Sequence, residues 1–181
     1  MTAYELATSR LRLRLLEEQD GELYRSLYTD PRVMARIAPP LTPADAVRDF
    51  GAAVAHNRRD APGHRTWAVF DRDDGRAAGI GALRRCGTRA EVGLMLLPWA
   101  WDGRRSHELL EALVGFALGP MSLEALDAVC MDGPNVRPSR RLVTPCGFVE
   151  VPAERPGTVQ WILRRDAWAT RADIGIAVAG G

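Results

Sequence analysis

The segment from Glu91 to Leu118 constrains the fold more than any other part of this sequence. Residues Glu91–Leu97 form a nearly continuous apolar run, which is typical of a strand that is buried on both faces. A short polar turn follows, and then comes a helix with a broad apolar face that ends at Gly119-Pro120. A strand, a turn and a helix in this order can direct free backbone N–H groups at an anion, which suggests a ligand that carries phosphate.

Length and charge limit the class of protein. A chain of 181 residues with 46% hydrophobic content can bury one good core and is too short for two ordinary domains with a linker. Its 24 basic and 23 acidic residues give a formal net charge of +1, so the whole chain is not drawn to nucleic acid by its charge. We therefore expect a single domain in which any anion binding is local.

The cysteines and the N-terminal sequence indicate the compartment. Cys86, Cys130 and Cys146 are odd in number and form no C-x-x-C pair, which argues against a disulfide framework and against a structural zinc site. The first residues show no basic segment followed by an apolar stretch, and no apolar run is long enough to span a membrane. We expect a cytoplasmic protein without a membrane partner.

The remaining chain alternates between strand and helix patterns. Leucine and arginine alternate strictly over Arg10–Leu15, which predicts a half-buried strand. Helices are expected at 20–28, 43–57 and 138–144, and strands at 66–70, 77–84, 126–131, 148–151 and 159–164. This order predicts an α/β fold with a mixed, mostly antiparallel sheet and one parallel strand–helix–strand crossover between Glu91 and Met131.

Two stretches resemble the GNAT N-acetyltransferase superfamily, in particular the branch that includes the ribosomal-protein N-terminal acetyltransferases. They are A-E-V-G-L-M-L-L-P-W-A-W-D-G-R-R-S-H-E-L-L, from Ala90, and G-P-N-V-R-P-S-R-R-L-V-T-P-C-G-F, which ends at Phe148. The residues in register with the family motifs are Glu91, Gly93, Leu96, Pro98, Trp101, Glu108, Ser139, Arg141, Leu142, Gly147 and Phe148. The resemblance implies a GNAT-like domain at 1–168, with a central splayed pair of parallel strands and flanking helices, followed by a frayed tail at 169–181.

The turn before the helix departs from the family pattern. In the family this turn wraps the pyrophosphate of acetyl-CoA with main-chain N–H groups, and its two usual glycines are Asp102 and Arg104 here. A usual lysine of the later motif is Pro145. The resemblance thus implies acetyl-CoA as the co-substrate, held through a degenerate pyrophosphate-binding turn.

Three interpretations of this turn stay open. The turn can be a plain helix N-terminus that is capped by Asp102 or Ser106. It can retain CoA, with flexibility from Gly103 and phosphate contacts from Arg104 or Arg105. The scaffold can also have lost CoA and gained another ligand, because a fold alone does not fix function.

The resemblance also assigns roles to other side chains and peptide groups. The pantetheine arm of CoA would bind the main chain of Leu94, Met95 and Leu96, with Asn135 near the same ligand. Glu91 would deprotonate the acceptor amine, although a structural pairing with Arg84 or Arg89 is the alternative.

Ser139 would assist the departing thiolate, or it would cap a helix that follows Pro138. Trp99 would stack on the acceptor or cover the core edge, and His107 is a further candidate for contact with the acceptor. His56, His64 and His107 lack the spacing of metal ligands, so no metal site is expected.

These residues predict an N-acyltransferase that moves an acetyl or other acyl group from acyl-CoA to a primary amine by direct attack. The acceptor would be a small-molecule amine or a protein N-terminus, contacted by loops near 38–41 and 152–158. The alternative is a GNAT-fold protein without CoA that binds a small molecule or uses an acyl group on an acyl carrier protein. Nothing in the sequence indicates the oligomeric state.

Overall fold

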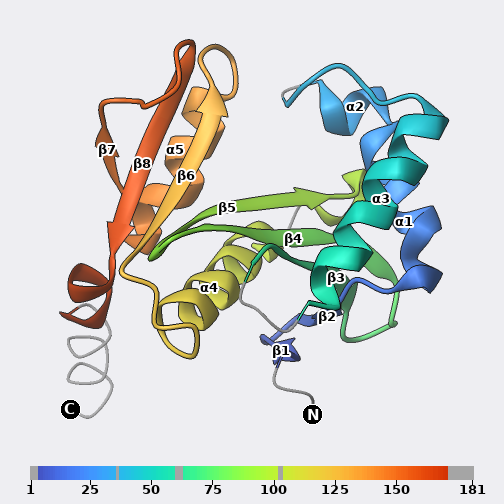
Figure 1. Ribbon diagram of the computed structural model, residues 1–181, viewed down its shortest axis with the longest axis horizontal. Coiled ribbons are helices and arrows are strands. Elements are labelled where there is room, and N and C mark those ends of the chain that lie inside the picture. The colour runs from blue at the N-terminus through green and yellow to red at the C-terminus, as the bar shows by residue number, and fades with distance from the viewer. Residues whose placement is uncertain (1–3, 36, 60–62, 102–103, 171–181) are drawn as a thin grey trace.

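A single mixed sheet organises the protein in the computed structural model, which describes residues 4–35, 37–59, 63–101 and 104–170. The eight strands lie in the order β1-β2-β3-β4-β5-β6-β8-β7 (Figure 1). Their bounds are β1 Leu6–Ala7, β2 Leu11–Leu15, β3 Arg65–Asp71, β4 Ala77–Cys86, β5 Arg89–Leu96, β6 Ala125–Met131, β7 Val149–Val151 and β8 Thr158–Arg164. Every neighbouring pair is antiparallel except β5 and β6, which are parallel. The predicted fold class is therefore confirmed.

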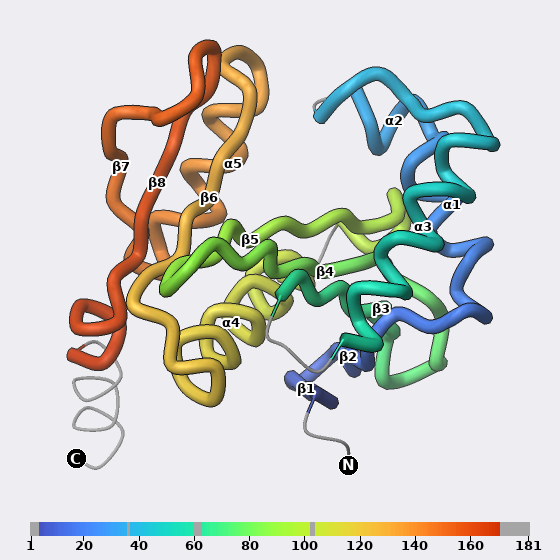
Figure 2. Tube along the Cα trace, in the orientation of Figure 1, coloured from blue at the N-terminus to red at the C-terminus, as the bar shows by residue number. Residues whose placement is uncertain are grey.

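Helices cover both faces of this sheet. The α-helices are α1 Gly21–Tyr28, α2 Pro31–Met34, α3 Pro43–Asn57, α4 Arg105–Leu118 and α5 Val136–Val143, with short 3-10 helices η1 Glu18–Asp20, η2 Pro98–Ala100 and η3 Thr144–Cys146. Figure 2 shows α4 on one side of the central strands and α1–α3 together on the other. Residues 165–170 are helical, and most of the predicted tail at 169–181 lies outside the described residues.

Two hydrophobic clusters hold these layers together. The larger cluster joins the sheet to α4, and both Leu11 and Leu13 of β2 are completely buried in it, as the alternating pattern predicted. The smaller cluster joins the opposite face, through Ile80 and Met95, to α1, α2 and α3. The two faces of β4 and β5 thus contact different sets of helices, with α1–α3 covering only the end of their face near Ile80 and Met95, and this burial on both sides explains the apolar residues at that end of β5.

The sequence Asp30-Pro31, just after the helix expected at 20–28, begins a further short helix. The Asp30 side chain accepts a hydrogen bond from the Arg32 N–H at 2.8 Å, and Pro31 is the first residue of α2. Proline suits this position because the first helical N–H has no intrahelical partner. The prediction therefore missed α2, together with the two-residue strand β1.

Candidate active site

The two parallel strands separate soon after they pair. Strand β5 pairs with β6 only over Arg89–Glu91, opposite Ala125–Asp127, whereas it pairs with β4 along its whole length. Strand β6 pairs with β8 instead, as far as Met131. Each strand follows its antiparallel neighbour, so the two diverge past Glu91 (Figure 1).

A polar network closes the narrow end of this split. Asp127 is buried and accepts hydrogen bonds from Arg89, one of them from Nε at 2.9 Å. Gln160 of β8 donates to the same carboxylate at 3.0 Å. Its own Oε1 accepts from the Glu154 N–H, which ties the β7–β8 loop to this point. A buried carboxylate that is bonded on several sides holds the strands in one register.

Peptide groups of β5 face the side from which β6 has departed. The Leu97 N–H donates to the Ala78 carbonyl at 2.8 Å, and every second residue of an antiparallel ladder bonds in this way. Met95 therefore directs its peptide groups at β4, while Leu94 and Leu96 direct theirs into the split. The Leu96 carbonyl already accepts from the Trp101 indole at 2.8 Å. Of the three residues that the resemblance implicates, Leu94 and Leu96 direct their peptide groups into the split, and Met95 does not.

Helix α4 begins without a side-chain cap at its N-cap residue, Arg104. The Glu108 N–H makes the bond to the Arg104 carbonyl at 3.1 Å, so the N–H groups of Arg105, Ser106 and His107 precede the intrahelical ladder. Ser106 lies inside the helix, so its predicted capping role is wrong. The alternative capping residue, Asp102, and the predicted ligand Gly103 lie outside the described residues.

Arg104 has a backbone conformation that favours glycine. Its φ of 66° and ψ of 5° lie in the left-handed region, where a side chain costs about 1 kcal/mol or more. Arg104 thus has a backbone geometry that glycine adopts at lower cost than any other residue. Its side chain is exposed.

The next residue, Arg105, has a protein partner. Its guanidinium donates to Asp71 Oδ2 from Nε at 3.0 Å and from Nη2 at 2.8 Å. It also lies over the Trp99 ring, and Arg76 lies over the same ring at 4.3 Å. Contacts with two guanidinium groups and with the main core favour the packing interpretation of Trp99, whose buried indole Nε1 has no hydrogen-bond partner among the described residues.

Glu108 ties the start of α4 to the turn between β1 and β2. It accepts hydrogen bonds from Thr8 Oγ1 at 2.6 Å, from Ser9 Oγ at 2.9 Å and from the Arg10 N–H at 3.0 Å, and it pairs with the Arg10 side chain. Burial raises the pKa of Glu108, but the hydrogen bonds from Thr8, Arg10 and Ser9 outweigh it and lower this pKa to about 2. Glu108 is therefore a fixed anion that anchors the helix. The adjacent His107 has a buried Nδ1 without a partner among the described residues.

The start of α5 lies at the carboxyl end of β6. Asn135 is the N-cap residue, and the Ser139 N–H donates to its carbonyl at 3.0 Å. Because α5 begins at Val136, Ser139 lies within the helix, and its predicted role as the cap is wrong. Parallel strands end at the same edge of a sheet, so the first turns of α4 and α5 flank the split.

Glu91 has a different partner from those that the sequence suggested. Its Oε2 accepts from Arg155 Nη2 at 2.9 Å, and its side chain is 33% exposed. Arg89 is engaged by Asp127 and Glu154 instead. Sequence reasoning placed the loop near 152–158 at the acceptor side, but no local signal distinguished Arg155 from its neighbours.

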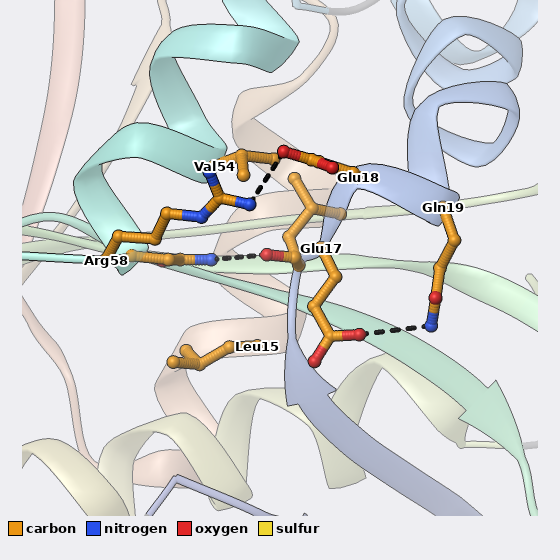
Figure 3. A pocket seen from close by; sticks show the side chains of 8 residues that line it. Leu15, Glu17, Glu18, Gln19, Val54 and Arg58 are labelled. Carbon is orange, nitrogen blue, oxygen red and sulfur yellow. Dashed lines mark hydrogen bonds and ion pairs between the residues drawn. The ribbon is translucent and has the colours of Figure 1, made fainter.

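Other features of the described chain lie apart from the split. A surface pocket of about 450 Å³ is lined by Leu15, Leu16, Glu17, Glu18, Gln19, Val54, Asn57 and Arg58. Its charged rim is internally paired, with Arg58 donating to Glu18 and Gln19 to Glu17 (Figure 3). In the described part of the chain, no group of three or more His, Cys, Asp or Glu residues is arranged to hold a metal ion. The described helices include none that is long and apolar enough to cross a membrane.

The site thus consists of a parallel strand pair that splits at its carboxyl end, with the N-termini of α4 and α5 beside it. Residues 10–149 match the family described as the acetyltransferase (GNAT) domain, and the chain belongs to that family. No curated protein matches the sequence.

Solved structures share the fold at low sequence identity. An acetyltransferase from Agrobacterium tumefaciens is 20% identical over 91% of this chain and 96% of its own, with a TM-score of 0.76. Spermidine N-acetyltransferase from Vibrio cholerae, solved with CoA and spermine, is 17% identical over 90% and 99%, with a TM-score of 0.75. A protein from the same organism described as a ribosomal-protein-serine acetyltransferase is 20% identical over 90% and 98%, with a TM-score of 0.69.

Proposed function

We propose that this protein transfers an acetyl or other acyl group from acyl-CoA to a primary amine. The observation that carries the proposal is the split between β5 and β6, into which the Leu94 peptide groups point. An extended pantetheine arm could add to this edge as a further strand would, with its amides bonded to the main chain. Membership of the GNAT family and the CoA-bound neighbour support the same co-substrate.

The start of α4 supplies the anion site of this proposal. The N–H groups of Ser106 and His107 precede the hydrogen-bond ladder of the helix and can face the pyrophosphate, and the helix dipole favours a negative charge there. Arg104 retains the left-handed backbone of a glycine and adds an exposed guanidinium at the same turn. The Arg105 guanidinium is already paired with Asp71, so a phosphate that contacted Arg105 would share this guanidinium with the Asp71 carboxylate. This geometry favours retention of CoA over a scaffold that has lost it.

The proposed reaction needs no covalent enzyme intermediate. The neutral amine attacks the thioester carbon, the new C–N bond forms, and the C–S bond breaks. Glu91 accepts a proton from the amine, directly or through water, once Arg155 has given way. The N–H of Leu94 or Leu96 stabilises the developing negative charge on the carbonyl oxygen. Ser139 donates a hydrogen bond to the departing sulfur, and the thiolate leaves as CoA after it takes up a proton.

Calorimetric titration with acetyl-CoA, followed by a thiol-release assay with a panel of amines, tests the proposal. We expect binding, and amine-dependent release of CoA that falls at least tenfold in Glu91→Gln while acetyl-CoA affinity is unchanged. Glu150→Gln is the matched control, because Glu150 is exposed and, among the described residues, its carboxylate pairs with Arg140 of α5 alone. Absence of acetyl-CoA binding at saturating concentration would overturn the proposal. Turnover of an acylated carrier protein alone would replace the CoA donor with a carrier.

A further inference from the structure

The face of β4 and β5 opposite α4 is covered at one end and open at the other. Ile80 and Met95, which are register partners, are buried beneath α1–α3. Toward the narrow end of the split, the same face presents Gly93, which is exposed. A Cβ atom added to Gly93 would meet no atom within 4 Å. The part of this face formed by Arg84, Glu91 and Gly93, called the open face below, therefore has unfilled space above it at Gly93.

Arg84 and Glu91, which carry opposite charges, both lie on this open face but do not form an ion pair with each other. Arg84 of β4 lies directly opposite Glu91 of β5, and such partners have Cβ atoms about 4.5–5.5 Å apart on the same face. The Glu91 carboxylate bonds instead to Arg155, from the β7–β8 loop. Arg84 is exposed and makes no hydrogen bond or ion pair with any other residue in the described ranges.

The acidic side chains near this open face already have partners other than Arg84. Asp127 and Glu154 both pair with Arg89, and Asp127 also accepts from Gln160. On the neighbouring elements, the titratable groups that interact electrostatically with Arg84 are Tyr28 of α1 and His64, which precedes β3. Burial is the main influence on both: it raises the pKa of Tyr28 and lowers that of His64, and the Arg84 charge lowers each of them. Neither group is an anion at neutral pH, so Arg84 is a cation without a counter-ion among the residues that the structure describes.

We propose that the acceptor is a small α-amino acid, with its amine at Glu91 and its carboxylate at Arg84. This inference rests on the proposed function and names the substrate class of the same site. The two charges of such a molecule lie a few ångströms apart, as do the two cross-strand side chains. A guanidinium binds a carboxylate through two parallel hydrogen bonds, which fixes orientation as well as charge.

The contact between Glu91 and Arg155 fits this assignment. It shows that the Glu91 carboxylate accepts a cation at the split, and an exposed ion pair of this kind is worth about 0–1 kcal/mol. The ammonium group of the acceptor can therefore displace Arg155 at little cost and then lose its proton to Glu91. A polyamine would also satisfy Glu91, but it would leave a second positive charge beside Arg84.

The test compares acceptors that differ only in the acid group. Acetyl-CoA-dependent turnover is measured for the standard L-amino acids, for their amides and for spermidine. We expect at least one amino acid to exceed its amide tenfold or more in kcat/KM. Arg84→Gln should raise KM for that amino acid at least tenfold and leave KM for acetyl-CoA and for the amide unchanged, while Arg84→Lys should restore part of the loss.

Two further variants separate a binding role from a folding defect. Arg85→Gln removes the same charge from the neighbouring residue on the opposite face and should change none of these constants. Gly93→Val should raise KM for the amino acid without loss of stability, because it fills open space.

Equal turnover of acids and amides, a preference for spermidine, or an equal effect of Arg84→Gln on both substrate types would overturn the amino-acid inference alone. Failure of acetyl-CoA to bind in the calorimeter would overturn the proposed function. In that case, titration of the amino acids into the free protein still tests the site, and the absence of Arg84-dependent binding would reject it.

Discussion

Arg105, the first residue of α4, donates two hydrogen bonds to one carboxylate oxygen of Asp71, the last residue of β3. The Asp71 side chain is 6% exposed and that of Arg105 is 22% exposed, so the pair is largely shielded from water. It fixes the start of the helix against the sheet at the proposed phosphate site. A defect here would therefore affect stability and ligand binding together.

We predict that Asp71→Asn lowers the free energy of unfolding by about 2 kcal/mol, because it removes a carboxylate to which a shielded guanidinium donates two hydrogen bonds. Urea denaturation measures the loss. Glu150→Gln breaks an exposed pair with Arg140 and should cost under about 1 kcal/mol. Equal losses in the two variants would show that the Arg105–Asp71 pair is no more than a surface contact.

The hydrogen bonds to Glu108 should make stability depend on pH. Its folded pKa of about 2 lies below the ordinary value of 4.5, so its stabilising contribution is complete above pH 4.5 and is lost as pH falls toward 2. Glu108→Gln should cost about 2 kcal/mol at pH 7, and the difference from wild type should shrink between pH 4.5 and 3. Urea unfolding of both proteins at several pH values measures this difference in the free energy of unfolding. A difference that does not vary with pH would contradict the assignment, and Glu22→Gln, on the exposed face of α1, serves as control.

The left-handed backbone at Arg104 predicts that Arg104→Gly stabilises the protein by about 1 kcal/mol. Arg104→Ala should bring no such gain, because alanine keeps the Cβ atom. Thermal unfolding and acetyl-CoA titration of both variants separate two effects. Loss of a phosphate contact would weaken affinity in both, whereas relief of strain would stabilise only the glycine variant.

Ser122 provides a control for this comparison. It also has a positive φ, of 52°, and follows α4 at the helix end away from the split. Ser122→Gly should leave acetyl-CoA affinity unchanged. If Arg104→Gly does not raise the melting temperature, the turn has a different conformation in solution.

Two glycines on the paired strands β4 and β5 should respond in opposite ways to alanine. A Cβ atom at Gly79 would lie 2.1 Å from the Met95 carbonyl oxygen and 2.8 Å from the Leu96 Cα, and neither backbone atom can move aside cheaply. Gly79→Ala should therefore cost about 3 kcal/mol, while Gly93→Ala should have almost no effect on stability. Chemical denaturation of both variants decides the matter. A well-tolerated Gly79→Ala would show that β4 and β5 are not so closely apposed.

Local pattern accounts for most of the secondary structure that could be predicted. The alternation in β2, the apolar run of β5 and the proline-led start of α3 each depend on neighbouring residues in the chain, so the sequence reveals them directly. The same reasoning misplaced Ser139. A serine after a proline suggests a cap, but α5 begins earlier, at Val136. Local signals also missed α2, because α2 has only four residues and its N-cap, Asp30, directly follows Thr29, the C-cap of α1.

The candidate site was predictable in part. The resemblance to the family pointed to β5, to the turn before α4 and to Glu91, and the structure places Glu91 at the narrow end of the split and the start of α4 beyond the carboxyl end of β5. The sequence could not show that the peptide groups of Met95 point toward β4 while those of Leu94 point away from β4, into the split. That distinction depends on the register between strands, and a shift of one residue would reverse it.

The sequence by itself determined the order of strands and helices and the family of the fold, because periodicity and motif spacing are properties of adjacent residues. Only the tertiary structure decided that Glu91 pairs with Arg155, 64 positions away, and that Arg84, directly across the strand pair, has no anionic partner in the described part of the chain. It also decided where β5 leaves β6. These features arise when distant segments compete for the same partners, and that competition is settled by the packing of the whole sheet.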